Sequence, residues 1–315
     1  MSGKDIYKDG LQVSKDWIAA LGDVDLDRLM HDMLCAQSER CGAAIKEVRT
    51  NTEVKAADEG CDGWSGVPGK PDVWLGDRET CWQFKAGSNS QPGKLGEEVG
   101  KPIPRQTLAA GGRFVVIASA STNGLAGENS RKAKLIEAAE LLNLPTDKID
   151  VIGSERLASW VNQHPALVPA RLGFPRVLSL DQFAKISQHD VEWQADEAKE
   201  RDLERFRSGL AYPRGGERHL HLQGRPGVGK SRFALELCRR ASWSRETIYL
   251  RQTLESEINQ IILGAAQDKL VRLVIVADEV QQGTLSVVRD LIDVSEGRIR
   301  LVTIGLNRCA VAFGA

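Results

Sequence analysis

A glycine-rich stretch followed by a lysine and a serine offers the clearest chemistry in the sequence. Residues 224–231, GRPGVGKS, match the pattern G-x-x-x-x-G-K-[ST] in full, after the strand-like HLHLQ and before the amphipathic KSRFALELCRR. Glycines let backbone N–H groups close around phosphate oxygens, and a helix N-terminus adds a positive partial charge. The pattern therefore predicts a site for ATP and Mg²⁺. Its residues are Gly224, Gly227, Gly229, Lys230 for the β- and γ-phosphates, and Ser231 for the metal.

Two later apolar runs end in polar residues that suit the same site. LVIVADE, residues 273–279, resembles a Walker B strand, in which Asp278 would hold Mg²⁺ and Glu279 would polarise the attacking water. IRLVTIGLN resembles the sensor-1 strand of AAA+ and STAND ATPases, in which a polar side chain, here Asn307, faces the γ-phosphate. Together with the glycine-rich loop they indicate a P-loop NTPase domain with strands near residues 218–223, 247–250, 272–277 and 300–305.

A glutamine and a lysine lie two residues apart in TCWQFKAGSN, residues 80–89. Alternate side chains of a strand share a face, so Gln83 and Lys85 would point the same way while Trp82 and Phe84 pack into a core. Lysine is rarely buried without a partner. We therefore expect this pair to do chemistry at the strand surface and not to be buried.

Three short segments resemble the Mrr-type branch of the PD-(D/E)xK nucleases. In that branch glutamine replaces the usual acid before the lysine, which gives the Q-x-K found at residues 83–85. The turn DEGCDG, residues 58–63, is similar to its DGGxDG turn, and LDRLMHDML, residues 26–34, is similar to its first helix. The resemblance covers roughly residues 20–175, and it implies a restriction-endonuclease-like mixed sheet with flanking helices.

The resemblance also implies a catalytic set for phosphodiester hydrolysis. Asp62 would bind Mg²⁺ together with the amide oxygen of Gln83, since hard oxygen ligands suit this metal. The metal would polarise the phosphate and activate water. Lys85 would stabilise the charge that develops on the phosphoryl group, and Asp27 would orient a ligand or a metal-bound water.

The identity of the acid is open at this point. Asp62 is preferred because it sits in a glycine-flanked turn. Asp72 is the alternative, since Pro71-Asp72 with the Q-x-K segment spells a literal PD-x10-QxK. Glu59 is close enough in the sequence to contribute.

Basic residues after the Q-x-K segment offer a local surface for nucleic acid. The net charge of −1 gives the chain no global attraction to DNA, so a DNA surface must be a patch. Candidates for contacts with the backbone of a duplex are Lys94, Lys101, Arg105, Arg113, Arg131 and Lys132.

The composition is that of an ordinary globular protein, with 315 residues of which 42% are hydrophobic and 27% charged. The six cysteines form no CxxC pair, which indicates reduced thiols of a cytoplasmic protein and argues against a zinc site. No apolar run approaches the roughly 18 to 20 residues that span a bilayer, and the N-terminus lacks a signal-peptide pattern. We expect no membrane association.

The order of the elements predicts an α/β protein of two domains. Residues 1–180 would form the nuclease-like domain, with a first helix near residues 25–39 and strands in AAIKEV, DVWLG and TCWQFK. Residues 181–212 would be a charged helical linker, and residues 213–315 the N-terminal part of the NTPase domain. A fifth strand and a helical lid are usual in such NTPases. Without them we expect a piece of a longer protein or an unusually minimal NTPase.

A Mrr-like nuclease joined to a P-loop NTPase resembles the bacterial antiphage defence proteins of the STAND class. The resemblance implies a Mg²⁺-dependent endonuclease acting on double-stranded DNA. ATP-driven assembly of a homo-oligomer would gate it, after a region beyond this sequence recognises a phage protein. The alternative is a signalling or scaffolding ATPase whose first domain binds DNA or a partner without cutting. A translocase is least favoured, because no helicase motifs follow the glycine-rich loop.

Overall fold

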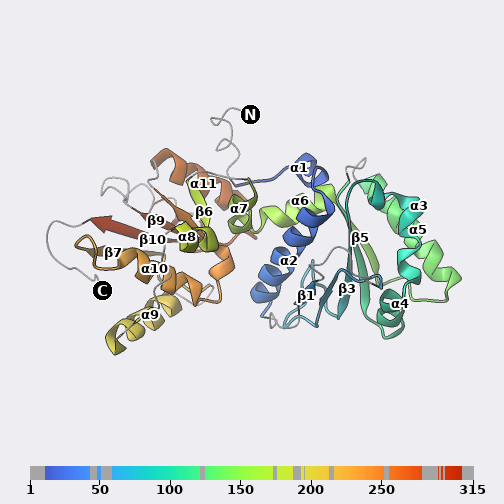
Figure 1. The fold of residues 1–315 in the computed structure, drawn as a ribbon, viewed down its shortest axis with the longest axis horizontal. Helices are drawn as coiled ribbons and strands as arrows, with labels where there is room; N and C mark the ends of the chain where they lie inside the picture. Colours follow the sequence, from blue (N-terminus) through green and yellow to red (C-terminus); the bar gives the residue numbers. More distant parts are fainter. Residues whose placement is uncertain are drawn as a thin grey trace. The chain divides into compact units, whose positions relative to one another are not determined.

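The computed structural model describes residues 11–42, 48–50, 59–120, 125–172, 176–186, 193–194, 196–212, 216–251, 255–278, 290, 292–293 and 295–306. The chain divides into two compact units, residues 13–161 and a second formed by residues 1–12 and 162–315. Each unit is an α/β fold with its own five-stranded sheet, which confirms the predicted fold class (Figure 1). Within the described part of the chain, no helix is long and apolar enough to cross a membrane.

The first unit is a mixed sheet in the order β1-β2-β3-β4-β5. The pairs β1–β2 and β2–β3 are antiparallel, whereas β3–β4 and β4–β5 are parallel. Its elements are α1 (Lys15–Ala19), α2 (Asp23–Arg40), β1 (Val48–Thr50), β2 (Gly63–Ser65), β3 (Thr80–Lys85), η2 (Gly87–Ser90), α3 (Pro92–Leu95), η3 (Glu98–Gly100), α4 (Pro102–Ala109), β4 (Arg113–Ala118), α5 (Leu125–Leu141), β5 (Ile149–Gly153) and α6 (Ser154–Asn162).

Helices cover both faces of this sheet, and β3 contributes alternate side chains to each. Cys81 joins a buried cluster with residues of α3, η3, α4 and α5. The neighbouring Trp82 points to the opposite face, where its ring lies 6.0 Å from that of Trp160 on α6. Trp160 in turn stacks on Trp74 at 5.0 Å. Figure 1 shows the sheet between α2 on one side and α3 to α5 on the other.

The predicted apolar face of the first helix is confirmed. Five of its residues are completely buried against the sheet, namely Leu26, Leu29, Met30, Met33 and Leu34. The strand expected in AAIKEV begins only at Val48, and residues 43–47 lie outside the described residues.

Residues 72–76, expected to form a strand, make a turn instead. The Asp72 carboxylate accepts the N–H groups of Trp74 at 2.8 Å and Leu75 at 2.9 Å, and Asp72 and Gly76 exchange backbone hydrogen bonds. Aspartate side chains compete with strand pairing through such local bonds, and the strand prediction overlooked this. The strand before β3 is the short β2, which the sequence did not predict.

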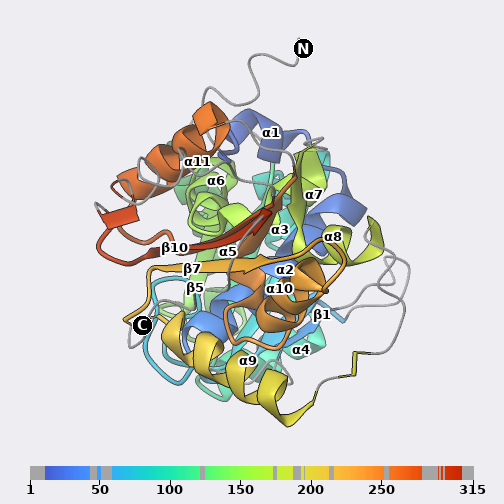
Figure 2. The same cartoon turned by 90° about the vertical axis from the view of Figure 1, so that its left-hand side faces the viewer.

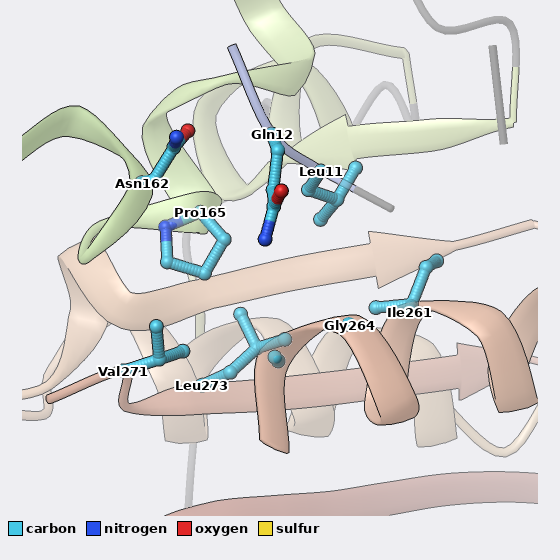
Figure 3. A pocket seen from close by; sticks show the side chains of 9 residues that line it. Leu11, Gln12, Asn162, Pro165, Ile261, Gly264, Val271 and Leu273 are labelled. Carbon is cyan, nitrogen blue, oxygen red and sulfur yellow. The ribbon is translucent and has the colours of Figure 1, made fainter. Parts of the chain in front are cut away.

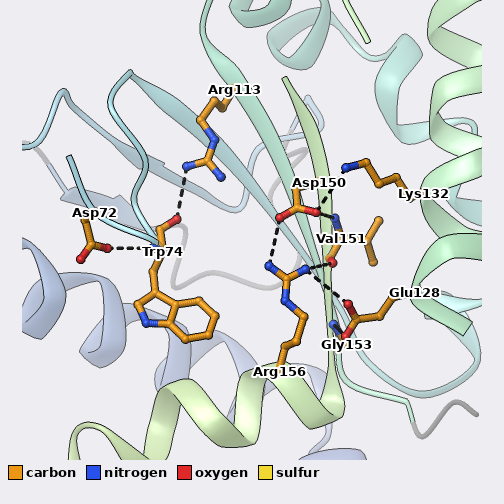
Figure 4. Close-up of polar contacts among 9 residues, drawn as sticks. All are labelled: Asp72, Trp74, Arg113, Glu128, Lys132, Asp150, Val151, Gly153 and Arg156. Carbon is orange, nitrogen blue, oxygen red and sulfur yellow. Dashed lines mark hydrogen bonds and ion pairs between the residues drawn. The ribbon is translucent and has the colours of Figure 1, made fainter. Parts of the chain in front are cut away.

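Ion pairs around the buried Glu128 tie α5, β5 and α6 together at the edge of the first sheet (Figure 4). Arg156 donates to Glu128 at 3.3 Å and to Asp150 at 3.2 Å, and Glu128 also accepts the N–H of Gly153 at 2.9 Å. A Cβ at Gly153 would lie 2.7 Å from a Glu128 oxygen, so only glycine allows this approach. The parallel strands β4 and β5 are thereby fixed to the helices that follow them.

The second unit contains a sheet in the order β6-β8-β9-β10-β7. All neighbouring pairs are parallel except β6–β8. Its elements are η4 (Pro165–Leu167), α7 (Pro169–Leu172), β6 (Val177–Ser179), α8 (Leu180–Ile186), α9 (Glu197–Gly209), β7 (His219–Gly224), α10 (Lys230–Arg239), η5 (Ser244–Glu246), β8 (Thr247–Leu250), α11 (Glu255–Gln267), β9 (Leu273–Asp278) and β10 (Ile299–Leu306). The four predicted strands are confirmed to within one residue.

Helices α9 and α10 pack on one face of this sheet and α11 on the other, as Figure 2 shows. The chain moves across the sheet in one direction from β7 to β8 and returns from β8 to β9. Right-handed crossovers then place the intervening helices on opposite faces. The carboxyl ends of β7, β9 and β10 therefore lie at one edge of the sheet, beside the glycine-rich loop.

The domain boundary predicted at residue 180 is wrong. Strand β6 hydrogen-bonds to β8, so residues 162–180 belong to the second unit and supply the fifth strand of its sheet. The charged helix α9 is not a linker either. Its buried residues Leu203 and Phe206 join the core of the second unit, and Arg240, which caps the C-terminus of α10, contacts Glu200 at 3.0 Å. The high charge of this helix concealed its narrow apolar stripe.

We predict that Phe206→Ala lowers the free energy of unfolding of the second unit by about 3 kcal/mol, because it removes a buried ring that α9 contributes to the core. Urea unfolding followed by tryptophan fluorescence measures this change. Arg201→Ala, at an exposed position of the same helix, should change it by less than about 0.5 kcal/mol. Equal stability of the two variants would mean that α9 is a linker after all.

Candidate functional site

The structure brings Asp62 to Gln83. The N–H of Asp62 donates to the Trp82 carbonyl at 2.9 Å, in line with the antiparallel pairing of β2 and β3. The Asp62 carboxylate oxygen Oδ2 accepts the N–H of Phe84 at 2.6 Å and the side-chain amide of Gln83. One carboxylate oxygen therefore fixes the turn before β2 to the Q-x-K strand.

The alternative acid, Asp72, lies elsewhere. Besides the two backbone N–H groups of its own turn, it accepts the amide of Gln37 at 2.8 Å, and Gln37 also accepts the Trp160 indole N–H at 3.1 Å. These contacts place Asp72 in the packing of α2 and α6, and no described contact joins it to Gln83 or Lys85. Glu59, the third acid considered, has an exposed side chain.

Gln83 and Lys85 are more buried than we expected. Gln83 has no exposed surface, and the Lys85 side chain is 17% exposed. The expectation that neither needed burial overlooked a partner, Glu98 at the start of η3. Its oxygen Oε1 lies 3.1 Å from the Lys85 ammonium nitrogen, and Oε2 lies 2.7 Å from that of Lys101.

Glu98 is the site residue that sequence reasoning missed. The segment GEEVGK was considered only as a source of basic residues. The spacing of Glu98 and Lys101, three positions apart, was the available signal for an ion pair. The contact with Lys85 joins residues 13 positions apart, and only the fold reveals it.

Asp27 lies on α2 within the electrostatic reach of Lys85. The pKa of its carboxyl is raised from 3.8 to about 6, mainly by burial and also by the charge of Asp23, while the Lys85 ammonium partly offsets the rise. A carboxyl with this pKa exchanges a proton near neutral pH, which suits a group that orients water.

Cys61 directly precedes Asp62 and is partly exposed. A hydrogen bond from the Cys81 thiol lowers the pKa of the Cys61 thiol. Burial instead raises the pKa of the Cys41 thiol to about 11 and that of the Cys238 thiol to about 12. Among these three thiols, the one beside the site is the most readily ionised.

The side chains at this site suit a hard cation. Asp62 and Gln83 offer carboxylate and amide oxygens, the ligands that Mg²⁺ prefers, and Mg²⁺ usually keeps several waters. Among the described residues, no group of three or more His, Cys, Asp or Glu side chains is arranged to hold a metal.

Several basic residues considered for DNA contacts are engaged in the fold. Arg131 is 3% exposed and donates to the Ser90 carbonyl. Arg113 donates to the Trp74 carbonyl at 3.2 Å, and Lys132 pairs with Asp150 at 3.7 Å, as Figure 4 shows. Of the six, Lys94 and Arg105 are exposed, and Lys101 is partly exposed and pairs with Glu98 at 2.7 Å.

The glycine-rich loop has the backbone conformation that its sequence predicted. Gly227 and Gly229 adopt φ of +80° and +89°, which favour glycine, and α10 begins at Lys230. The Lys230 ammonium donates to the Gly224 carbonyl at 2.8 Å and to the Arg225 carbonyl at 3.0 Å. Neutral carbonyl oxygens thus hold the lysine across the loop.

The Walker B aspartate reaches the loop. Ser231 donates its hydroxyl to Asp278 at 3.3 Å, and Tyr249 on β8 donates its hydroxyl to the same carboxylate oxygen. This contact brings together the two residues predicted to hold Mg²⁺ at the nucleotide site. Sequence reasoning missed Tyr249, because it lies inside a buried strand. Glu279 and Asn307 lie outside the described residues.

A small pocket in the second unit lies away from the glycine-rich loop (Figure 3). Gln12, Pro165 and residues of α11 line it, and its volume is about 10 Å³. That is room for about one water molecule, whereas pockets for small molecules measure roughly 300 to 1,000 Å³. We assign it no role in nucleotide binding.

Comparisons with known proteins add little to this geometry. No protein family model matches the chain, and no curated protein matches it. Among solved structures, it is similar to one described as the structure of C. elegans PCH-2, with 14% sequence identity and a TM-score of 0.27. The match covers 36% of this chain and 37% of that one. A likeness of this size carries no argument about fold or function.

We predict that Asp27 makes stability depend on pH. Its pKa is higher in the folded chain, so its contribution to stability is complete below about pH 4 and is lost as the pH rises through about 6. Asp27→Asn should remove this pH-dependent loss of stability. Urea unfolding at a series of pH values between about 4 and 7 measures the free energy of unfolding of both proteins. In Lys85→Ala the Asp27 midpoint should move upward, as NMR titration of the carboxyl would record. A midpoint near 4, or one insensitive to Lys85, would contradict the assignment.

Proposed function

We propose that the chain is a Mg²⁺-dependent endonuclease for double-stranded DNA, gated by ATP-driven assembly and acting in bacterial antiphage defence. The observation that carries the proposal is the contact of Asp62 with Gln83, beside Lys85 on the same strand face. A carboxylate and an amide can hold a metal that polarises the phosphate, and an ammonium group beside them can stabilise the charge of the transition state.

The residues have distinct roles in the proposed reaction. Asp62 and the amide oxygen of Gln83 would bind Mg²⁺, which supplies polarisation of the phosphate and an activated water. The Lys85 ammonium would stabilise the negative charge that develops on the phosphoryl oxygens. Asp27, with its raised pKa, would hold or release a proton of the attacking water.

The second unit supports the gating half of the proposal. The glycine-rich loop, Lys230 and the contact of Ser231 with Asp278 form an arrangement suited to ATP and Mg²⁺. Two copies assembled on nucleotide would bring two metal sites together, so both strands of a duplex could be cut. A lone copy would be quiet, which suits an otherwise toxic DNase.

A second candidate is a signalling or scaffolding ATPase whose first unit binds DNA without cutting it. The observation that favours it is the complete burial of Gln83, together with the two N–H groups already bound to one Asp62 oxygen. Calorimetric titration with Mg²⁺ or Mn²⁺ separates the two functions. DNA binding without metal binding would favour this second candidate.

For the nuclease, we predict that Asp62→Ala and Lys85→Ala each lower plasmid cleavage by at least about a hundredfold, since each removes a group that contacts the reacting phosphate or its metal. Cleavage is measured on supercoiled plasmid with Mg²⁺ and ATP. Lys148→Ala, which removes a lysine at the opposite end of the strands, should cut like the wild type. Unchanged cleavage by Lys85→Ala would refute the site assignment.

For the ATP site, we predict that Lys230→Ala weakens ATP binding by about ten- to a hundredfold, because a hydrogen bond to a charged group contributes roughly 1.5 to 3 kcal/mol. Binding is measured with a fluorescent ATP analogue. Lys269→Ala, at an exposed position of the same unit, serves as the control. Equal affinities for the two variants would exclude the glycine-rich loop as the nucleotide site.

A further inference from the structure

We propose that Lys101 is a second phosphate-binding lysine of the first unit, held beside Lys85 by the carboxylate of Glu98. The inference rests on the proposed function, because it names a further contact that the same site makes with the backbone of a DNA duplex. Lys85 would bind the reacting phosphodiester, and Lys101 would bind a non-bridging oxygen of that phosphate or of its neighbour.

One buried carboxylate joins the two lysines. Glu98 is 8% exposed, and its two oxygens lie 3.1 Å from the Lys85 nitrogen and 2.7 Å from the Lys101 nitrogen. The exposure of the side chains rises from 17% at Lys85 to 33% at Lys101. Lys101 is therefore the more accessible of the two lysines to solvent, and a duplex must approach from the solvent side.

Counted by themselves, Lys85, Lys101 and Glu98 carry an excess of one positive charge, and the Asp27 carboxyl is a further acid within reach of Lys85. Two ammonium groups share a single carboxylate, and a phosphodiester carries one negative charge that would balance them. A buried carboxylate is costly without cationic partners, so Glu98 holds both lysines in place when no ligand is present. Glu98 is thus a positioning residue, and the lysines are the groups that contact substrate.

A second contact fixes Lys101 to the turn that carries Asp62. Gly60 has φ of +91°, and a Cβ there would lie 2.6 Å from the Lys101 Cβ and 2.9 Å from its Cδ. The carbonyl of Glu59 also accepts the N–H of Ile103 at 3.3 Å. The stem of Lys101 is therefore packed against the chain two residues before Asp62.

The N-terminus of α4 cannot supply this phosphate contact through its backbone. Pro102 and Pro104 have no N–H group, and the N–H of Ile103 is bound to Glu59. A helix start of this kind offers little to an anion, so the positive charge at this point comes from the Lys101 side chain.

The test measures binding of a fluorescent 20-base-pair duplex in EDTA, where no cleavage occurs, across a series of salt concentrations. Lys101→Gln keeps the side-chain stem and removes the charge. The slope of log affinity against log salt should fall by about 0.9, the value for one lost phosphate contact. Lys101→Arg should restore the slope. The matched control is Lys148→Ala, a lysine of similar exposure with a single ion pair to Asp147, and its slope should equal that of the wild type.

Glu98→Gln provides a readout that loss of folding cannot imitate. Without its carboxylate, the two lysines gain net charge toward the duplex, so binding should tighten. Cleavage in Mg²⁺ should fall, because Lys85 is no longer held. Binding and cleavage that fall together would overturn the positioning role of Glu98.

The outcomes separate this inference from the proposed function. A wild-type salt slope in Lys101→Gln overturns the inference and leaves the nuclease proposal intact. A reduced slope, with unchanged cleavage in Lys85→Ala, supports the phosphate-binding lysine and refutes the hydrolytic site. A wild-type chain that binds no duplex overturns both.

Discussion

The alternation of side chains along β3 is the constraint on which the first unit depends. Trp82 and Phe84 point into the core shared with α2 and α6, so Gln83 and Lys85 must point to the other face. A register slip of one residue would bury the lysine among tryptophans and move Trp82 and Phe84 to the face that α3 to α5 cover. The Asp62 carboxylate holds this register, because it binds both the backbone at Phe84 and the side chain of Gln83. Packing and site geometry are thus two consequences of one strand.

The two units hold their lysines in different ways. Lys85 is bound to a buried carboxylate, whereas Lys230 is bound to neutral carbonyl oxygens of its own loop. A phosphate that binds Lys230 replaces two neutral carbonyl groups as its partner. A phosphate that binds Lys85 must compete with the full negative charge of the Glu98 carboxylate. The second unit is therefore the more ready of the two to bind phosphate, in keeping with the proposed gating of the first unit by ATP.

Much of this architecture could be read from the sequence, and the failures have physical causes. Long apolar runs and a strong loop pattern predicted β3 and the four parallel strands of the second unit, because period and motif are local properties. The turn at Asp72 was missed because a carboxylate that binds nearby N–H groups overrides β-propensity. Glu98 and the strand β6 were missed because their partners are distant in the sequence. The charged helix α9 was misjudged because its two buried residues are outnumbered by charges.

The close approach of Gly60 to Lys101 restricts which residues can occupy the two positions, both in evolution and in protein engineering. These positions are 41 residues apart, yet any larger residue at the first would push away the stem of the second. The turn before β2, the strand β3 and the start of α4 therefore depend on one another for their positions. A graft of β2 and β3 onto another scaffold would therefore have to include α4. In related chains, a change at either position should be accompanied by a change at the other.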